Sequence, residues 1–203
     1  MIARLALLSV LPALLVACTP DEPEAAVEVP KPTVWGPQAL VDQDPDFDVV
    51  EVVLTADETT VDWMDGGSTP VWSYNGVVPG PIIQAWVGDT VRVIFTNNLD
   101  EPTTIHWHGL RIDNLMDGVP AVQDPVQPGE TFTYEFVVPD AGSYWYHPHV
   151  RSDIQVESGL QGTLVVHERE PLAYDMDRYF VIDDVLLTDS GQPYAFRPMS
   201  HMT

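Results

Sequence analysis

Four histidines of this sequence stand in two short motifs with metal-ligand spacing. The motifs are His106-Trp107-His108 and His147-Pro148-His149, each at the end of a strand-like run. In an extended backbone, residues i and i+2 point to the same face, so each motif presents two imidazoles side by side. Neutral imidazole is a common ligand for transition metals. If the motifs lie on neighbouring strands, their four rings surround one small volume, and we expect a site for more than one ion.

Spacing alone does not name the metal, because zinc enzymes and cupins also use His-x-His pairs. A cupin site needs a carboxylate four residues after the second histidine, and Ile112 stands there, so the cupin interpretation fails. Ordinary strand histidines are the remaining alternative. Two pairs, both flanked by aromatic residues, argue against it.

The elements that must position these motifs are predicted to be short β-strands. Phe132, Tyr134 and Phe136 alternate with polar residues, as in a half-buried strand. Turn signals rich in glycine and proline separate such runs. The expected strands cover residues 49–56, 71–74, 82–86, 91–97, 103–107, 131–138, 143–147 and 162–167. After the N-terminal apolar run no helical period lasts three turns, so we expect an all-β sandwich of about 120 residues.

One connection, Gly109–Glu130, is much longer than the others and carries three prolines. Long loops in compact domains are usually functional. Because this loop begins directly after the first histidine pair, we expect it to wall the metal site.

The N-terminus has the pattern of an export signal. Arg4 precedes an apolar run over residues 5–16, which is too short to span a bilayer. Cys18 follows Leu15-Val16-Ala17, a sequence similar to the lipobox of bacterial lipoproteins. We therefore expect a signal peptide over residues 1–17, lipidation of Cys18 and a periplasmic or cell-surface location. A plain secretory signal with an incidental cysteine is the alternative.

Residues 18–48 are rich in proline and acids, and we expect them to form a tether. The whole chain carries 31 acidic and 8 basic residues, a formal net charge of −23. Such a surface repels nucleic acid and anionic membranes, so we expect membrane contact only through a lipid anchor. With Cys18 as the one cysteine, the chain forms no intrachain disulfide.

A new pattern begins near residue 171. Residues 179–187 read as another β-run, and the sequence then stops at Thr203 in the middle of the pattern. We interpret residues 171–203 as the truncated start of a second domain, after a first domain over residues 49–168.

The order of the motifs resembles the first cupredoxin domain of the multicopper oxidases, the laccase-like enzymes. The similarity covers about residues 49–168 and includes Asn75-Gly76, Pro79-Gly80-Pro81, Gly88-Asp89, His-Trp-His-Gly and Trp-Tyr-His-Pro-His. The resemblance implies a Greek-key, plastocyanin-like β-sandwich. It also implies oxidation of a donor coupled to reduction of O2 to water with four electrons.

The resemblance further implies roles for single residues. His106 matches a ligand of the type 2 copper, and His108, His147 and His149 match ligands of the type 3 copper pair. Asp117 matches an acidic residue thought to help deliver protons. A simple turn aspartate before Gly118 is the alternative for it.

The chain also departs from the family pattern. A type 1 copper needs a cysteine thiolate with two histidines, and Cys18 lies in the signal region, so the type 1 copper is not in this chain. Four histidines supply half of the trinuclear ligand set. We therefore expect the N-terminal portion of an exported multicopper oxidase, inactive alone, whose electron donor the sequence does not identify. The alternatives are a non-catalytic copper-binding lipoprotein module and a subunit completed by a partner.

Overall fold

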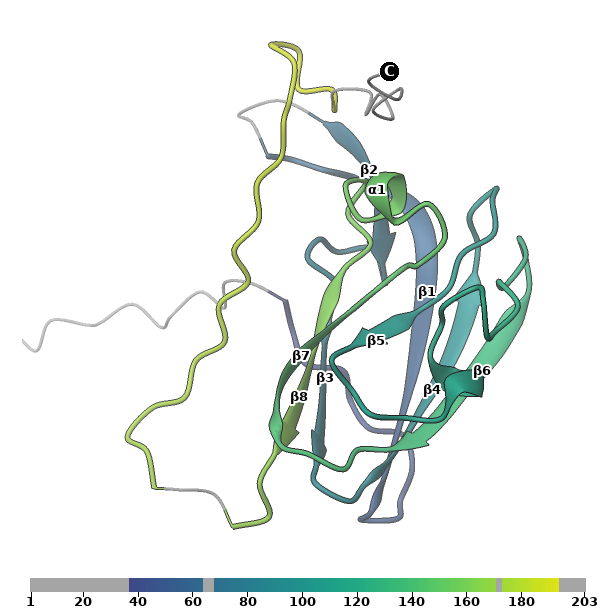
Figure 1. Ribbon diagram of the computed structural model, residues 1–203. Coiled ribbons are helices and arrows are strands. Elements are labelled where there is room, and N and C mark those ends of the chain that lie inside the picture. Colours follow the sequence, from purple (N-terminus) through teal and green to yellow (C-terminus); the bar gives the residue numbers. More distant parts are fainter. Residues whose placement is uncertain (1–36, 64–67, 171–172, 194–203) are drawn as a thin grey trace, which may run out of the picture. The chain divides into compact units, whose positions relative to one another are not determined.

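The structure, a computed structural model, describes residues 37–63, 68–170 and 173–193 (Figure 1). The expected signal peptide, Cys18 and the first part of the tether lie outside these ranges. Among the described residues, no helix is long and apolar enough to cross a membrane. The two short helices are η1 (Asn114–Met116) and α1 (Ser152–Gln155).

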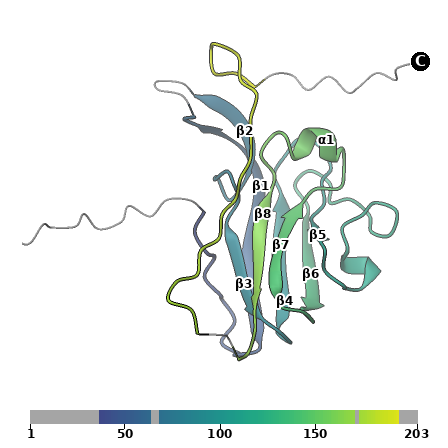
Figure 2. The same ribbon diagram turned by 60° about the vertical axis from the view of Figure 1, so that its left-hand side comes forward.

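Two four-stranded sheets face each other, as both ribbon views show (Figures 1 and 2). One sheet has the order β2-β1-β4-β6, and the other has the order β3-β8-β7-β5. The first contains β1 (Val49–Val61), β2 (Thr69–Tyr74), β4 (Thr90–Asn97) and β6 (Thr131–Val137). The second contains β3 (Ile82–Trp86), β5 (His106–His108), β7 (Gly142–His147) and β8 (Gly162–His167). The predicted all-β sandwich is confirmed.

The sheets pack through the side chains that their alternation turns inward. Along β4, every second residue is buried, including Val91, Val93 and Phe95. Trp107 in β5 and Tyr146 in β7 are also buried, with ring centroids 5.7 Å apart. Because side chains alternate along a strand, burial of these two rings turns the neighbouring histidines out of the core.

The observed strands agree with most of the predicted ranges, but three differ. β1 continues to Val61, five residues beyond its predicted end at residue 56. β5 holds only three residues, since Thr103 forms an isolated bridge with Val126 instead of continuing the strand. The strand predicted over residues 179–187 is wrong: the segment pairs with no strand and forms only an isolated bridge between Leu187 and Pro193. Phe180 and Ile182 are 84% and 94% exposed, so this segment buries no apolar face in the described structure.

Part of the segment expected as a tether lies along the sandwich. The Leu40 amide donates to the Ile82 carbonyl at 2.8 Å, and Ala39 bridges β3. Asp44 forms an ion pair with Arg92 at 3.0 Å. The described residues from about 38 onward therefore belong to the packed domain.

Candidate metal centre

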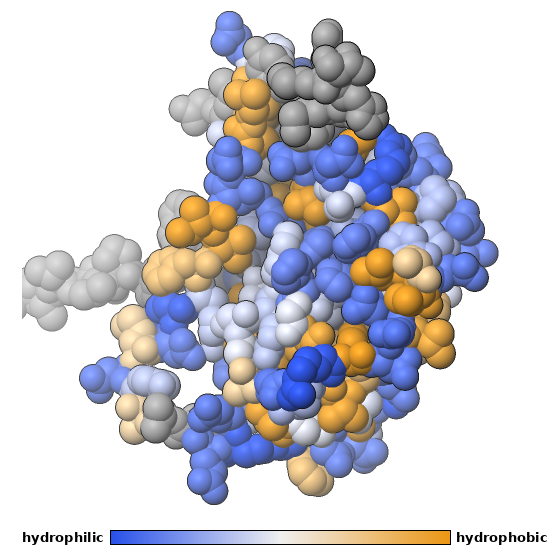
Figure 3. All heavy atoms as spheres, in the orientation of Figure 1, coloured by the Kyte–Doolittle hydropathy of each residue, from blue (hydrophilic) through white to orange (hydrophobic). Residues whose placement is uncertain are grey.

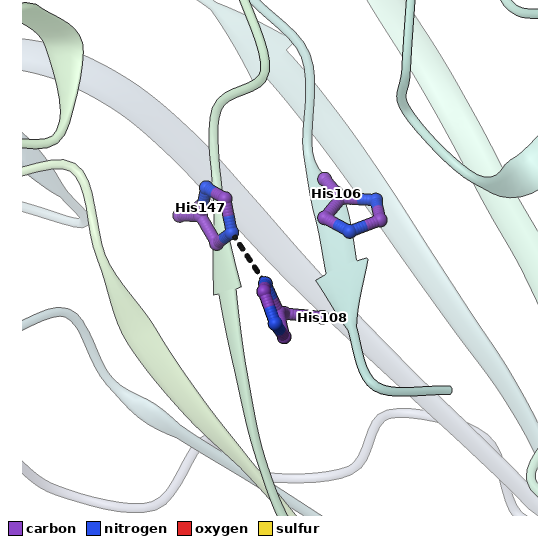
Figure 4. Close-up of side chains that lie close together, drawn as sticks. All are labelled: His106, His108 and His147. Atoms are coloured by element: carbon purple, nitrogen blue, oxygen red, sulfur yellow. Dashed lines mark hydrogen bonds between the residues drawn. The ribbon is translucent and has the colours of Figure 1, made fainter. Parts of the chain in front are cut away.

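The two histidine motifs meet because β5 and β7 are antiparallel neighbours. His106 pairs with His147 across the two strands, and His108 pairs with Trp145. Figure 4 shows His106, His108 and His147 converging from the two strands. The predicted juxtaposition of the two motifs is present in the structure.

Three of the imidazoles form a compact group of possible ligands. One nitrogen each of His106, His108 and His147 lies within 4.8 Å of the other two. His149 follows the end of β7, and its ring centroid is 5.3 Å from that of His106. The rings of the other three histidines therefore lie around that of His106.

Hydrogen bonds determine which nitrogen two of these rings present. His106 Nδ1 donates to the main-chain oxygen of Asp117 at 2.7 Å, and His147 Nδ1 donates to the Pro148 oxygen at 2.9 Å. A carbonyl oxygen can only accept, so both Nδ1 atoms carry the proton. In the neutral rings the lone pair is therefore on Nε2, the atom that can bind a metal; in this structure Nε2 of His147 accepts from His108 Nδ1.

The distance between His108 and His147 suits a shared ion. His108 Nδ1 and His147 Nε2 lie 3.2 Å apart and form the hydrogen bond marked in Figure 4, which a shared ion would replace. Two nitrogens that bind one ion at about 2.0 Å and a near-tetrahedral angle lie roughly 3.3 Å apart. The residues therefore fit an imidazole-bound transition metal without rearrangement of this pair.

Burial keeps His147 in the ligand form. Desolvation lowers the pKa of His147 to about 4, although its hydrogen bond to Pro148 opposes the shift. Its ring stacks on Trp145 with centroids 3.8 Å apart. The imidazole is thus neutral at pH 7, and the indole covers one of its faces.

The backbone of His149 is held by the segment that directly precedes the first motif. The His149 amide donates to Thr104 Oγ1 at 3.0 Å, and Thr104 is fully buried. Further along, Gln155 accepts from Thr103 Oγ1 at 2.7 Å and donates to Glu101 at 2.9 Å. These bonds tie the chain after the second motif to the chain before the first.

Asp117 reaches the first motif with two different atoms. Its carboxylate oxygen lies 3.4 Å from His106 Nδ1, and its main-chain oxygen is the closer partner. The long loop therefore contacts the histidine cluster as expected. The structure places the Asp117 carboxylate next to His106, where it is one-quarter exposed.

Sequence reasoning missed several residues that contact or support the histidines. Trp145 precedes His147 by two positions, so strand alternation already places it on the same face. Thr104 had no comparable signal, because its partner His149 lies 45 positions further along the chain. His167, which lies outside the two motifs, is half-buried, bonded to Gln84 at 2.9 Å and packed on Trp86.

Comparison with known proteins gives a consistent set of similarities. A family model described as "Multicopper oxidase" matches residues 55–171. The multicopper oxidase MmcO of Mycobacterium tuberculosis is 40% identical over 136 residues, which cover 66% of this chain and 26% of that protein. A copper resistance protein A homologue of Pseudomonas syringae is 41% identical and covers 75% of this chain and 25% of the homologue.

Solved structures resemble the fold as well. A multicopper oxidase from Pseudomonas thermotolerans is 49% identical, with a TM-score of 0.61 over 63% of this chain and 31% of that one. Lac15, from a marine microbial metagenome, is 43% identical, with a TM-score of 0.66 over 70% of this chain and 38% of that one. The predicted cupredoxin-like sandwich is confirmed. The chain spans about a quarter of the length of these two curated relatives.

Proposed function

Because this chain belongs to the multicopper oxidase family, we propose that it is the N-terminal portion of an exported oxidase. The whole enzyme couples one-electron oxidation of a donor to four-electron reduction of O2. The observation that carries the proposal is the convergence of His106, His108 and His147 at the end of two paired strands. The donor stays unidentified, because the type 1 copper region that would select it is not in this sequence.

In this proposal, the four histidines supply half of the ligands of a trinuclear copper cluster. His106 would hold the type 2 copper through Nε2, and His108, His147 and His149 would hold type 3 coppers. The 3.2 Å separation of His108 and His147 supports a shared ion. Bound copper would supply electron transfer to O2, since imidazole supports copper in both oxidation states.

Asp117 is proposed to hold or pass a proton at its carboxylate. Its 3.4 Å approach to His106 supports this role, because a carboxylate there lies within reach of a molecule bound beside that ring. The remaining ligands and the type 1 copper would come from further domains or from a partner chain.

Export and lipidation belong to the same proposal. The copper resistance proteins among the relatives support a function connected with copper, and the expected location rests on the N-terminal sequence. A signal peptide over residues 1–17, a lipid on Cys18, a tether that starts at residue 18 and ends near residue 37, where the packed domain begins, and a second domain starting near residue 171 remain our expectations. Mass spectrometry of the mature protein would show a diacylglyceryl-modified Cys18, and an unmodified N-terminus would contradict the anchor.

One observation favours a second candidate, a non-catalytic copper-binding module. Three imidazoles already lie within 4.8 Å of one another without a contribution from any other chain. Such a module would bind copper and consume no O2, even when the rest of the polypeptide is present.

Copper titration of this chain tests the shared part of both candidates. We expect the wild-type chain to retain copper after desalting and His106→Ala or His108→Ala to retain less, measured by elemental analysis and electron paramagnetic resonance. His167→Ala is the matched control, because His167 is bonded to Gln84 at the far end of β8. Equal retention by all four proteins would overturn the proposed site.

Reading the encoding gene beyond the Thr203 codon separates the two candidates. Continuation of the frame into a His-Cys-His segment and two more histidine pairs supports the oxidase, and O2 uptake with a phenolic donor then measures its activity. A stop codon with no partner chain able to restore O2 uptake supports the module instead.

A further inference from the structure

A single peptide unit in the long loop connects His106 to a buried glutamine. The carbonyl of Asp117 accepts from His106 Nδ1 at 2.7 Å, and the amide of Gly118 donates to Gln123 Oε1 at 2.9 Å. These carbonyl and amide groups are the two sides of the same peptide plane, which is rigid. Fixing the amide therefore also fixes the direction of the carbonyl that holds the imidazole.

The other end of the same glutamine supports the backbone that carries His106. Gln123 Nε2 donates to the Tyr134 hydroxyl at 3.0 Å, and that hydroxyl also accepts from the Ile105 amide at 2.8 Å. Ile105 directly precedes His106. The Gln123 side chain thus restrains the Asp117 carbonyl, which holds the His106 ring. Through Tyr134 it also restrains the backbone at Ile105, directly before His106.

Burial makes these bonds difficult to replace. Gln123 is 7% exposed, Tyr134 is fully buried and Ile105 is fully buried. In such a place a lost partner leaves a polar group without water, which is costly. The orientation of the amide is also determined, because the Gly118 amide can only donate and so requires the oxygen of Gln123.

We propose that Gln123 is a positioning residue that fixes the ring orientation and the protonated nitrogen of His106. With Nδ1 held to the Asp117 carbonyl, Nε2 is the nitrogen presented to the metal. The link to copper rests on the proposed function. The link between Gln123 and the imidazole rests only on the contacts above.

The test uses nitrogen-15 NMR of the histidine rings in the metal-free chain. We expect wild-type His106 to show one protonated Nδ1, with a proton that exchanges slowly with water. Gln123→Leu removes both hydrogen bonds at similar volume, and we expect a mixture of the two ring forms. Gln123→Glu keeps an acceptor for Gly118 and can accept from the Tyr134 hydroxyl, so it should restore the wild-type ring signal.

Two further proteins keep the test decisive. Asp89→Asn alters another fully buried polar residue, which accepts from the Trp86 amide at the other end of the sheet, and it should leave His106 unchanged. Tyr134→Phe cuts the link to Ile105 and replaces Gln123→Leu if that variant does not fold. A His106 signal that is unchanged in both Gln123→Leu and Tyr134→Phe would overturn the proposal. An equal change in Asp89→Asn would overturn it as well.

Copper affinity gives the second readout. Loss of a group that orients a metal-binding histidine typically weakens binding about 10-fold to 100-fold, and we expect that loss in Gln123→Leu and recovery in Gln123→Glu. If the wild-type chain binds no copper while Gln123→Leu still changes the His106 ring form, the proposed function fails and the positioning role stands. Equal copper affinity in wild type and Gln123→Leu would overturn the role of Gln123 at the metal.

Discussion

The protonation of the histidines is decided by contacts that differ from residue to residue. His147 is 6% exposed, stacks on Trp145 and donates through Nδ1 to Pro148. Removal from water disfavours the charged imidazolium, which explains why the pKa of His147 is lowered to about 4. The neutral ring can bind a cation, and the same burial makes the folded chain less stable in acid.

This shift predicts how the metal-free chain responds to pH. An unfolded histidine has a pKa of about 6.5, so between pH 6.5 and 4 the unfolded chain binds a proton that folded His147 does not. The free energy of unfolding therefore falls as the pH drops through this window. We expect His147→Gln to show a smaller fall than wild type in urea unfolding at pH 7 and pH 4.5. His167→Gln is the control, and a matching reduction in it would contradict the assignment to His147.

The four histidines could be predicted from sequence because their spacing coincides with the two-residue period of a strand. Gln123 and Thr104 could not, since each acts through partners 5 to 45 positions away that only folding brings close. The nitrogen used by each ring was also beyond sequence reasoning, because it depends on the main-chain oxygens of Asp117 and Pro148.

At the scale of elements, the short strand β5 depends on the loop that follows it. Gly118 has a φ of +77°, and a Cβ there would lie 1.9 Å from the Ile105 oxygen. The loop therefore contacts the backbone of Ile105, the residue directly before β5. A side chain at this position would push the loop off the strand.

A matched pair of glycine variants tests this contact. Gly129 ends the same loop with a φ of +78°, but its added Cβ would have nothing within 4 Å. Gly129→Ala should cost only the left-handed backbone strain, about 1–2 kcal/mol. Gly118→Ala carries the same strain plus the clash, so we expect a clearly larger loss in the urea midpoint and loss of the slowly exchanging His106 proton. Equal losses would contradict the close approach.

For the C-terminal segment over residues 179–187, we expect substitutions to have little effect on stability. Phe180 and Ile182 are almost fully exposed, so Phe180→Ser and Ile182→Ser should change the stability of this chain by less than about 0.5 kcal/mol. Leu164→Ala, at a fully buried position of β8, should cost about 2–5 kcal/mol. Thermal unfolding measures all three, and a large effect of the two serine variants would show that the segment packs on the domain.

This segment also shows where pattern reading of strands reaches its limit. Alternation and turn residues located β3 and β8 at their observed bounds, because those strands have neighbours that bury one face. Residues 179–187 carry similar apolar content but lack a neighbouring strand here. A strand is completed by its partner, which the local sequence does not contain.

At the scale of the whole molecule, acidic charge is the dominant feature. The net charge is −23, and hydrophilic side chains cover much of the face shown in Figure 3, between separate hydrophobic patches. Arg92 in β4 gathers three of the carboxylates. Glu51 and Glu135 lie directly across from it on the flanking strands, and Asp44 approaches from the N-terminal segment, at N–O distances of 2.9, 2.7 and 3.0 Å.

Salt should therefore stabilise this chain, and it should stabilise Arg92→Gln more strongly. Removing the guanidinium leaves three carboxylates facing one another, and their repulsion is screened as the Debye length falls from about 30 Å at 0.01 M salt to about 3 Å at 1 M. Arg178→Gln is the matched control: it changes the net charge equally, but Arg178 is an exposed residue bonded to the Asp177 carbonyl. Urea midpoints across this salt range should rise most steeply for Arg92→Gln. Parallel slopes for the two variants would mean that total charge, and not the grouping around Arg92, governs the response, because only the local carboxylates distinguish the two substitutions.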